Sequence, residues 1–186
     1  MDKKILKFNS KPYIIKNNKF STIQFNLIFE AKFLKKYIFY LPLLKQLLLN
    51  TSKNYKKEKE YRKELKNNMI ISLNMRSYNY NENLFIEFIL VVPDPKKIKD
   101  YNIEKAFKFF IDTIYNPNVI NDAFDIEQFE REKEFLKTDI YESIKKVKNR
   151  AYQSFLNIVD DNGILKDNIY NNMNLIDEAN NIELYN

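Results

Sequence analysis

The chain of 186 residues contains a single glycine, Gly163, and has neither histidine nor cysteine. Without cysteine no disulfide can stabilise it, and without either residue type it cannot form a zinc finger, a usual haem site or a nucleophile triad. One glycine also excludes the glycine-rich loops that bind phosphates and dinucleotides. Because 45% of its residues are apolar and 30% are charged, the chain must fold around an ordinary apolar core. Most enzyme chemistry is closed to such a chain acting alone.

Charge is distributed unevenly along the chain. The net charge is +6, but residues 1–99 carry 21 Lys and Arg against 8 Asp and Glu, whereas residues 100–186 carry 10 against 17. The two parts therefore have net charges of +13 and −7. We interpret most of these charges as solvated surface, and their separation as a sign of intramolecular complementarity or of a polar docking face.

No segment has the pattern of a targeting or membrane-spanning sequence. Residues 1–10 contain no apolar run of signal-peptide length. The longest apolar stretch, residues 37–49, is interrupted by Pro42 and Lys45, and it is too short to span a bilayer. We therefore expect a soluble, cytoplasmic protein without a membrane contact.

Several strands are predicted in the first half of the chain. Residues 22–29 alternate between apolar and mostly polar side chains. Residues 69–78 alternate in the same way, so one face of this strand is polar. Residues 84–92 are more uniformly apolar, which is typical of an inner strand. Residues 12–16 suggest a further short strand, joined to the first by a turn at residues 17–19. The pattern thus predicts a hairpin near the N-terminus.

Two helices are predicted between these strands. Residues 38–49 favour a largely buried helix with Pro42 near its first turn. Residues 55–66 are charged nearly all round, so we expect an exposed helix held to the body by Tyr61 and Leu65. Because its acids and bases are interleaved and arginine is scarce, we do not interpret it as a nucleic-acid contact.

The second half of the chain is predicted to be helical. An apolar stripe marks residues 103–114. A further helix start is indicated by Asp125 with Gln128 three residues later, a capping-box spacing, and by Phe124 and Phe129 at the staple positions. From there an apolar stripe continues as one helix or two, until residues 160–163 end it; its members are Leu136, Ile140, Ile144, Val147, Ala151, Phe155 and Ile158. Strands, two helices, strands and then helices indicate an α+β fold with an antiparallel sheet and helices on one face. No repeat or linker divides residues 1–186, so we expect one domain.

The order of these elements and several short stretches of sequence resemble one lobe of the insulinase/pitrilysin-type zinc peptidases. The clearest is Asn116-Pro117 followed by Phe124-Asp125 and by Phe129-Glu130-Arg131-Glu132-Lys133, where the family has an acidic helix. The helix that ends at Asn50-Thr51 occupies the place of the family's zinc helix. The resemblance covers about residues 20–185, and within the family it is most similar to the non-catalytic, insulinase-like proteins of low-GC bacteria associated with elongation factor P modification. It implies an insulinase-like lobe that ends before the family's further strands, so we expect a domain that is incomplete at its C-terminus.

The residues at the family's motif positions lack the required chemistry. Anchored on Asn50-Thr51, the two histidine positions fall on Leu41 and Lys45, and the general-base position falls on Leu44. In the acidic helix, Glu132 matches the first acid, and Asp139 stands where the third ligand belongs. Zinc requires several donors and a base beside its bound water. We therefore predict no catalytic residues, no metal or cofactor site and no zinc-peptidase activity.

The resemblance implies a binding role instead. In this family peptides add a strand to a sheet edge, which uses backbone hydrogen bonds and needs no metal ligand. The expected function is that of an inactive subunit, a peptide-binding or structural partner of a zinc-bearing paralogue, present as a heterodimer or a homodimer. The alternative is a small basic protein that binds nucleic acid or the ribosome through residues 1–99. A third reading is a remnant without activity.

Overall fold

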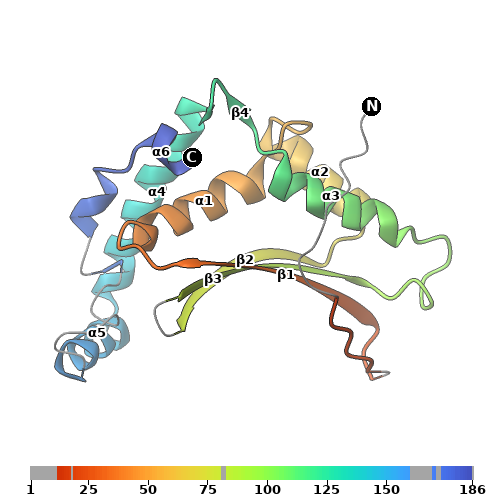
Figure 1. Cartoon of the computed structure of the whole chain (residues 1–186), viewed down its shortest axis with the longest axis horizontal. Coiled ribbons are helices and arrows are strands. Elements are labelled where there is room, and N and C mark those ends of the chain that lie inside the picture. The colour runs from red at the N-terminus through yellow and green to blue at the C-terminus, as the bar shows by residue number, and fades with distance from the viewer. Residues whose placement is uncertain (1–11, 18, 81–82, 160–168, 171–172, 186) are drawn as a thin grey trace.

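The computed structural model describes residues 12–17, 19–80, 83–159, 169–170 and 173–185 (Figure 1). Three long antiparallel strands form its main sheet: β1 (Thr22–Lys32), β2 (Ser72–Tyr80) and β3 (Asn83–Pro93). The strand order is β1-β3-β2, so the more apolar strand is the central one, as predicted.

Three helices cover one face of this sheet, and the described elements leave the opposite face open (Figure 1). They are α1 (Tyr37–Asn50), α2 (Glu58–Asn67) and α3 (Ile103–Tyr115). The covered face follows from the alternation in β1, where Phe25 and Leu27 stand opposite Leu90 and Phe88 of β3. Both β3 residues are buried, and the two β1 residues pack against the same core. The α+β fold with helices on one face of an antiparallel sheet is therefore confirmed.

The predicted N-terminal hairpin is wrong. Residues 12–17 form no strand, and Ile14 is 73% exposed. The whole of β1 pairs with β3 instead, from Thr22 opposite Pro93 to Lys32 opposite Asn83. The physical reason is length and matching pattern, since β3 offers an eleven-residue partner whose apolar residues lie on the same face as those of β1.

Helix α1 supplies much of the core, and it begins one residue earlier than predicted, so Pro42 lies beyond its first turn. The helix begins at Tyr37, so Pro42 is inside it and leaves the Ile38 carbonyl without its usual helical donor. Because α1 is apolar on nearly all sides, the burial of its side chains compensates for this lost hydrogen bond. Its buried residues are Phe39, Tyr40, Leu41, Leu43, Leu47 and Leu48.

Helix α2 is held to the body in the way the sequence predicts. Tyr61 is fully buried, and its hydroxyl lies 3.0 Å from the hydroxyl of Thr113 in α3. Burial raises the pKa of the Tyr61 phenol, with a smaller opposing effect from this hydrogen bond. Leu65 is half-buried, and the exposed side carries the predicted Glu58–Arg62 ion pair at 2.6 Å.

A small hairpin that the sequence analysis missed follows α3. It consists of β4 (Val119–Ile120) and β5 (Ala123–Phe124). Both loop residues, Asn121 and Asp122, are left-handed, with φ of 53° and 58°. Asparagine and aspartate tolerate this conformation better than other non-glycine residues, which explains how a chain with one glycine makes a two-residue loop here.

Helix α4 (Ile126–Lys145) begins at the predicted cap. The Asp125 carboxylate accepts a hydrogen bond of 2.9 Å from the backbone N–H of Gln128. Phe124 and Phe129, at the staple positions, are both buried in the same core cluster. The hairpin therefore delivers the chain to α4 at a defined angle.

Replacing Asp125 with alanine is expected to lower the free energy of unfolding by about 1 kcal/mol, because one helix N–H loses its acceptor. Urea denaturation monitored by circular dichroism would measure this change. Asp125→Asn is the matched control and should recover most of the stability, since asparagine caps equally well. A loss of the same size in both variants would contradict capping as the role of Asp125.

The long apolar stripe divides between two helices. Helix α4 ends at Lys145, Lys146 has an extended backbone, and α5 runs over Val147–Val159. The side-chain amide of Asn149 donates to the Ser143 carbonyl at 2.9 Å, which satisfies one free acceptor at the end of α4. Leu136, Ile140 and Ile144 pack into the core as expected. The later members of the stripe are exposed, and the predicted stop at residues 160–163 lies outside the described residues.

The described chain closes with a 3₁₀ turn, η1 (Met173–Ile176), and the short helix α6 (Asn181–Tyr185). Ile176 is fully buried in the main core. Among the described residues, no helix combines the length and the apolar character needed to cross a membrane.

Candidate functional site

The three residues that the sequence analysis matched to a zinc motif, Leu41, Leu44 and Lys45, all lie on α1. Leu41 is 8% exposed and belongs to the main apolar cluster, and Leu44 packs against that cluster. Lys45 is half-buried on the same helix. Two leucines and one lysine offer no donor that zinc accepts at neutral pH.

The two acidic residues of α4 are not brought together. Glu132 is buried, and its carboxylate accepts a hydrogen bond of 2.9 Å from the Arg131 guanidinium. Asp139 is exposed. Within the described parts of the chain, no three acidic side chains gather in a way that could hold a metal ion.

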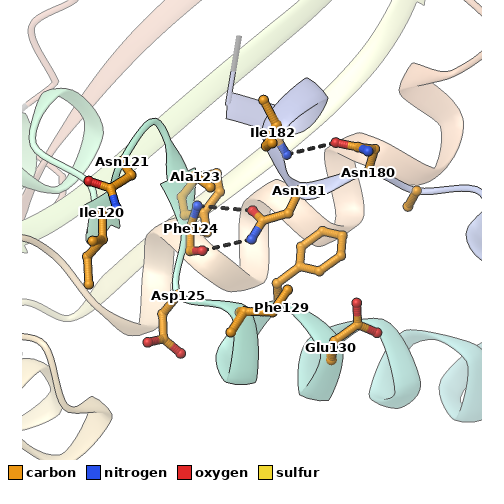
Figure 2. Close-up of a pocket in the computed structure, with 12 residues that line it drawn as sticks. Ile120, Asn121, Ala123, Phe124, Asp125, Phe129, Glu130, Asn180, Asn181 and Ile182 are labelled. Atoms are coloured by element: carbon orange, nitrogen blue, oxygen red, sulfur yellow. Dashed lines mark hydrogen bonds between the residues drawn. The ribbon is translucent and has the colours of Figure 1, made fainter.

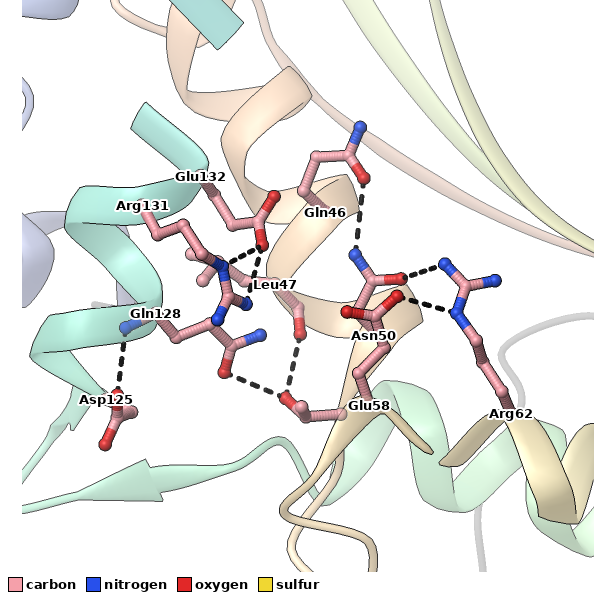
Figure 3. A network of polar contacts seen from close by, with 10 residues as sticks. Gln46, Leu47, Asn50, Glu58, Arg62, Asp125, Gln128, Arg131 and Glu132 are labelled. Carbon is pink, nitrogen blue, oxygen red and sulfur yellow. Dashed lines mark hydrogen bonds and ion pairs between the residues drawn. The ribbon is translucent and has the colours of Figure 1, made fainter. Parts of the chain in front are cut away.

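A small polar cluster joins the end of α1 to the first part of α4 (Figure 3). The buried hydroxyl of Thr51 lies 3.1 Å from the amide oxygen of Gln128 and 3.3 Å from the Leu47 carbonyl. The Gln128 amide nitrogen is buried and finds no hydrogen-bond partner among the residues that the structure describes. A single carboxylate beside a guanidinium, with amide and hydroxyl groups, can fix the packing of two helices, but it assembles no nucleophile with a base.

The open face of the sheet carries a different group of residues. At its centre Glu87 of β3 is only 2% exposed. One carboxylate oxygen accepts a hydrogen bond of 2.6 Å from the Asn26 amide of β1, and the other accepts one from the Arg76 guanidinium of β2. Around this bridge the face is partly apolar, with Ile28 51% and Tyr78 44% exposed.

Strand β1 also presents an unpaired edge. Among the described residues it pairs with β3 alone. Because the Asp94 N–H donates to the Ser21 carbonyl in the same register, the odd-numbered residues of β1 direct their backbone groups towards β3. The even-numbered residues therefore direct their N–H and C=O groups outwards: Thr22, Gln24, Asn26, Ile28, Glu30 and Lys32. An edge of eleven residues without proline is a template for strand addition.

A pocket of ≈ 580 Å³ lies between the small hairpin, the start of α4 and α6 (Figure 2). Beside it, the Asn181 amide accepts from the Phe124 N–H at 3.0 Å and donates to the Phe124 carbonyl at 2.7 Å. This side chain thus satisfies both outward groups of β5, as a neighbouring strand would. Sequence reasoning missed this contact, since nothing in an isolated asparagine indicates it.

An ion pair and a hydrogen bond also hold helix α6 to the start of α1. The Glu183 carboxylate accepts hydrogen bonds from the Lys36 ammonium at 2.6 Å and from the Tyr40 hydroxyl at 2.8 Å. These contacts hold the pKa of Glu183 below its usual value. The Lys137 ammonium in α4 similarly lowers the pKa of Asp177.

These shifts predict loosening of residues 173–185 in acid. A lowered pKa means that the folded chain favours the ionised carboxylate, so the contribution to stability is complete above the ordinary pKa. It is lost as the pH falls through the lowered value. The protection factors of the α6 amides, which correct for the pH dependence of intrinsic exchange, should therefore fall below about pH 4. Glu183→Gln should show faster exchange already at neutral pH with a weaker acid response, whereas an unchanged profile would contradict the role of Glu183.

Comparisons with known proteins identify the fold but no family. No protein-family model and no curated protein matches the chain. A solved structure described as a conserved protein from Enterococcus faecalis V583 is similar over 92% of this chain, with a TM-score of 0.81 and 18% sequence identity. The matched region is 41% of that protein, so the chain spans less than half the length of its structural neighbour. At this identity the likeness shows that the two share a fold.

Proposed function

We propose that this chain is a non-catalytic, insulinase-like subunit that acts as a peptide-binding or structural partner of a zinc-bearing paralogue. The observation that carries the proposal is the match of nearly the whole chain to 41% of a protein more than twice its length. A fold unit that occurs within a larger protein has surfaces that the remainder of that protein can cover. The fold unit of this chain therefore offers surfaces that are suited to pairing with a second such unit.

The surface of the chain supports this proposal. Within the described part of the chain no strand pairs with the outward backbone groups of β1, and the open face beside them carries exposed Ile28 and Tyr78. Strand addition derives its affinity from backbone hydrogen bonds and its specificity from alternate side chains. Leu41 and Leu44 do not interfere with such binding, because Leu41 is buried in the core and Leu44 is half-buried against it.

The proposal predicts that the purified chain binds no stoichiometric zinc and hydrolyses no peptide. Elemental analysis after incubation with zinc and dialysis measures the first property, and a quenched-fluorescence peptide library measures the second. The double variant Leu41→His/Lys45→His places histidines at the two matched positions, and it serves as the comparison for zinc retention and peptide hydrolysis. One equivalent of retained zinc, together with chelator-sensitive cleavage by the natural chain, would overturn the prediction.

The pairing itself is tested by co-expression with an insulinase-type protein of the same genome that bears His-x-x-Glu-His. Co-elution of the two chains in one complex at both low and high salt is the expected result. The alternative function, a basic nucleic-acid-binding protein, predicts instead a complex with RNA or DNA whose affinity falls steeply as salt increases. That outcome, without any complex of the two proteins, would favour the alternative.

A further inference from the structure

Helix α5 exposes its apolar side to solvent. In Figure 1 it lies beyond the end of the sheet, away from the layer formed by α1, α2 and α3. Val147, Ala151, Phe155 and Ile158 recur at helical spacing and share one side of it. All four are exposed, with Phe155 at 56% and Ile158 at 80%. Tyr152 and Val159 flank them and are more than half exposed.

The opposite side of α5, which faces the body, is mainly polar. Asn149 donates to Ser143 at the end of α4, and Leu156 is the one buried apolar residue among the described side chains of α5. The Gln153 amide oxygen is buried, and no described residue donates a hydrogen bond to it. An amphipathic helix normally buries its apolar side, so α5 is oriented as if a second apolar surface belonged on it.

We propose that a second copy of this chain covers that surface, with the two α5 helices packed antiparallel across a two-fold axis. We call this surface, formed by Val147, Ala151, Phe155 and Ile158, the α5 stripe. The proposed dimer uses a different surface from the β1 edge and goes beyond the function proposed above. A second copy is favoured because the stripe complements itself in size and in charge.

Size complementarity follows from the order of residues. If the axis crosses the α5 stripe midway between Ala151 and Phe155, antiparallel packing sets Ala151 of one copy opposite Phe155 of the other, and this occurs twice. Val147 then meets Ile158 or Val159 at each end. Small residues opposite large ones allow two helices to interdigitate without voids, and a self-complementary patch is what two-fold symmetry requires.

Charge complementarity selects the antiparallel direction. The charged residues of α5, Lys148 and Arg150, lie in its first half, and its last turn contains no base. Parallel helices would place the cations of both copies side by side. In the antiparallel pair each Lys148 instead reaches the last turn of the partner copy's helix, where free carbonyls favour a cation, while its aliphatic stem packs over the apolar stripe.

The test is sedimentation equilibrium of the full chain over low to high micromolar concentrations. The natural chain should pass from monomer to dimer, and Phe155→Arg should weaken dimerisation at least about tenfold. The matched control is Phe135→Arg in α4, where the replaced ring is equally exposed at 58%. The control should dimerise like the natural chain. Circular dichroism confirms that both variants fold.

A second pair of variants tests the register. Ala151→Phe sets two rings against each other and should weaken the dimer, and adding Phe155→Ala in the same chain exchanges the large and small positions and should restore it. A natural chain that stays monomeric, equal behaviour of Phe155→Arg and Phe135→Arg, or no restoration by the exchange would each overturn the proposal. None of these outcomes bears on binding at the β1 edge, so the two proposals fail separately.

Discussion

Replacing Tyr61 with alanine is expected to lower the free energy of unfolding by about 3–5 kcal/mol, the range for removal of a fully buried aromatic side chain. Tyr61 is the buried residue of α2, and its ring lies 5.0 Å from that of Phe109 in α3. Its hydroxyl also shares a hydrogen bond with Thr113, which the substitution leaves buried without a partner. Because the rest of α2 is mostly charged, we expect Tyr61 to supply most of the apolar contact that holds this helix.

Thermal and urea denaturation measure this effect. Tyr61→Phe keeps the ring and separates the hydrogen bond from the packing, so it should cost about 1–2 kcal/mol. Leu65→Ala, at a half-buried position of the same helix, serves as the control for a general loss of apolar surface and should have a smaller effect than Tyr61→Ala. If Tyr61→Ala cost no more than Leu65→Ala, the anchoring role of Tyr61 would be contradicted.

The second large effect concerns partner binding at the edge of β1. Ile28→Pro should weaken the complex with the zinc-bearing paralogue at least about tenfold, because proline removes an outward N–H and its ring obstructs an added strand. The fold should tolerate the change, since the Ile28 N–H does not bond to β3.

Ile28→Ala is the matched control. It removes the exposed side chain but keeps the N–H, so it separates the loss of apolar contact from the loss of the backbone bond. Surface plasmon resonance would give both affinities. Equal affinities for the proline and alanine variants would show that the partner does not bind as a strand.

The elements of this fold could be predicted where local chemistry decides them. Asp125 with Gln128 predicted the start of α4, and the alternation in β1 predicted its buried face. The apolar residues Tyr61 and Leu65 in a charged helix were predicted to be its anchors. Each of these depends on residues within a turn or two of one another.

The partner of each strand and the surface that covers each apolar face could not be predicted in the same way. Alternation in β1 shows which face is apolar but not which strand lies beside it, so the choice of β3 over residues 12–16 was missed. The apolar stripe of α5 likewise shows an apolar side but not what covers it. The contact of Asn181 with Phe124 joins positions 57 residues apart. Only the small hairpin had a usable local signal, Asn121-Asp122 between short apolar pairs.

Residue-resolved amide exchange in β1 is the decisive test of the proposal that this strand binds a strand of the partner. In the isolated chain the odd-numbered amides of β1 should be protected by β3, and the outward amides of Gln24, Asn26 and Ile28 should exchange rapidly. In the complex with the zinc-bearing paralogue, those outward amides should become protected. Unchanged rapid exchange at all three positions in a saturated complex would contradict the account.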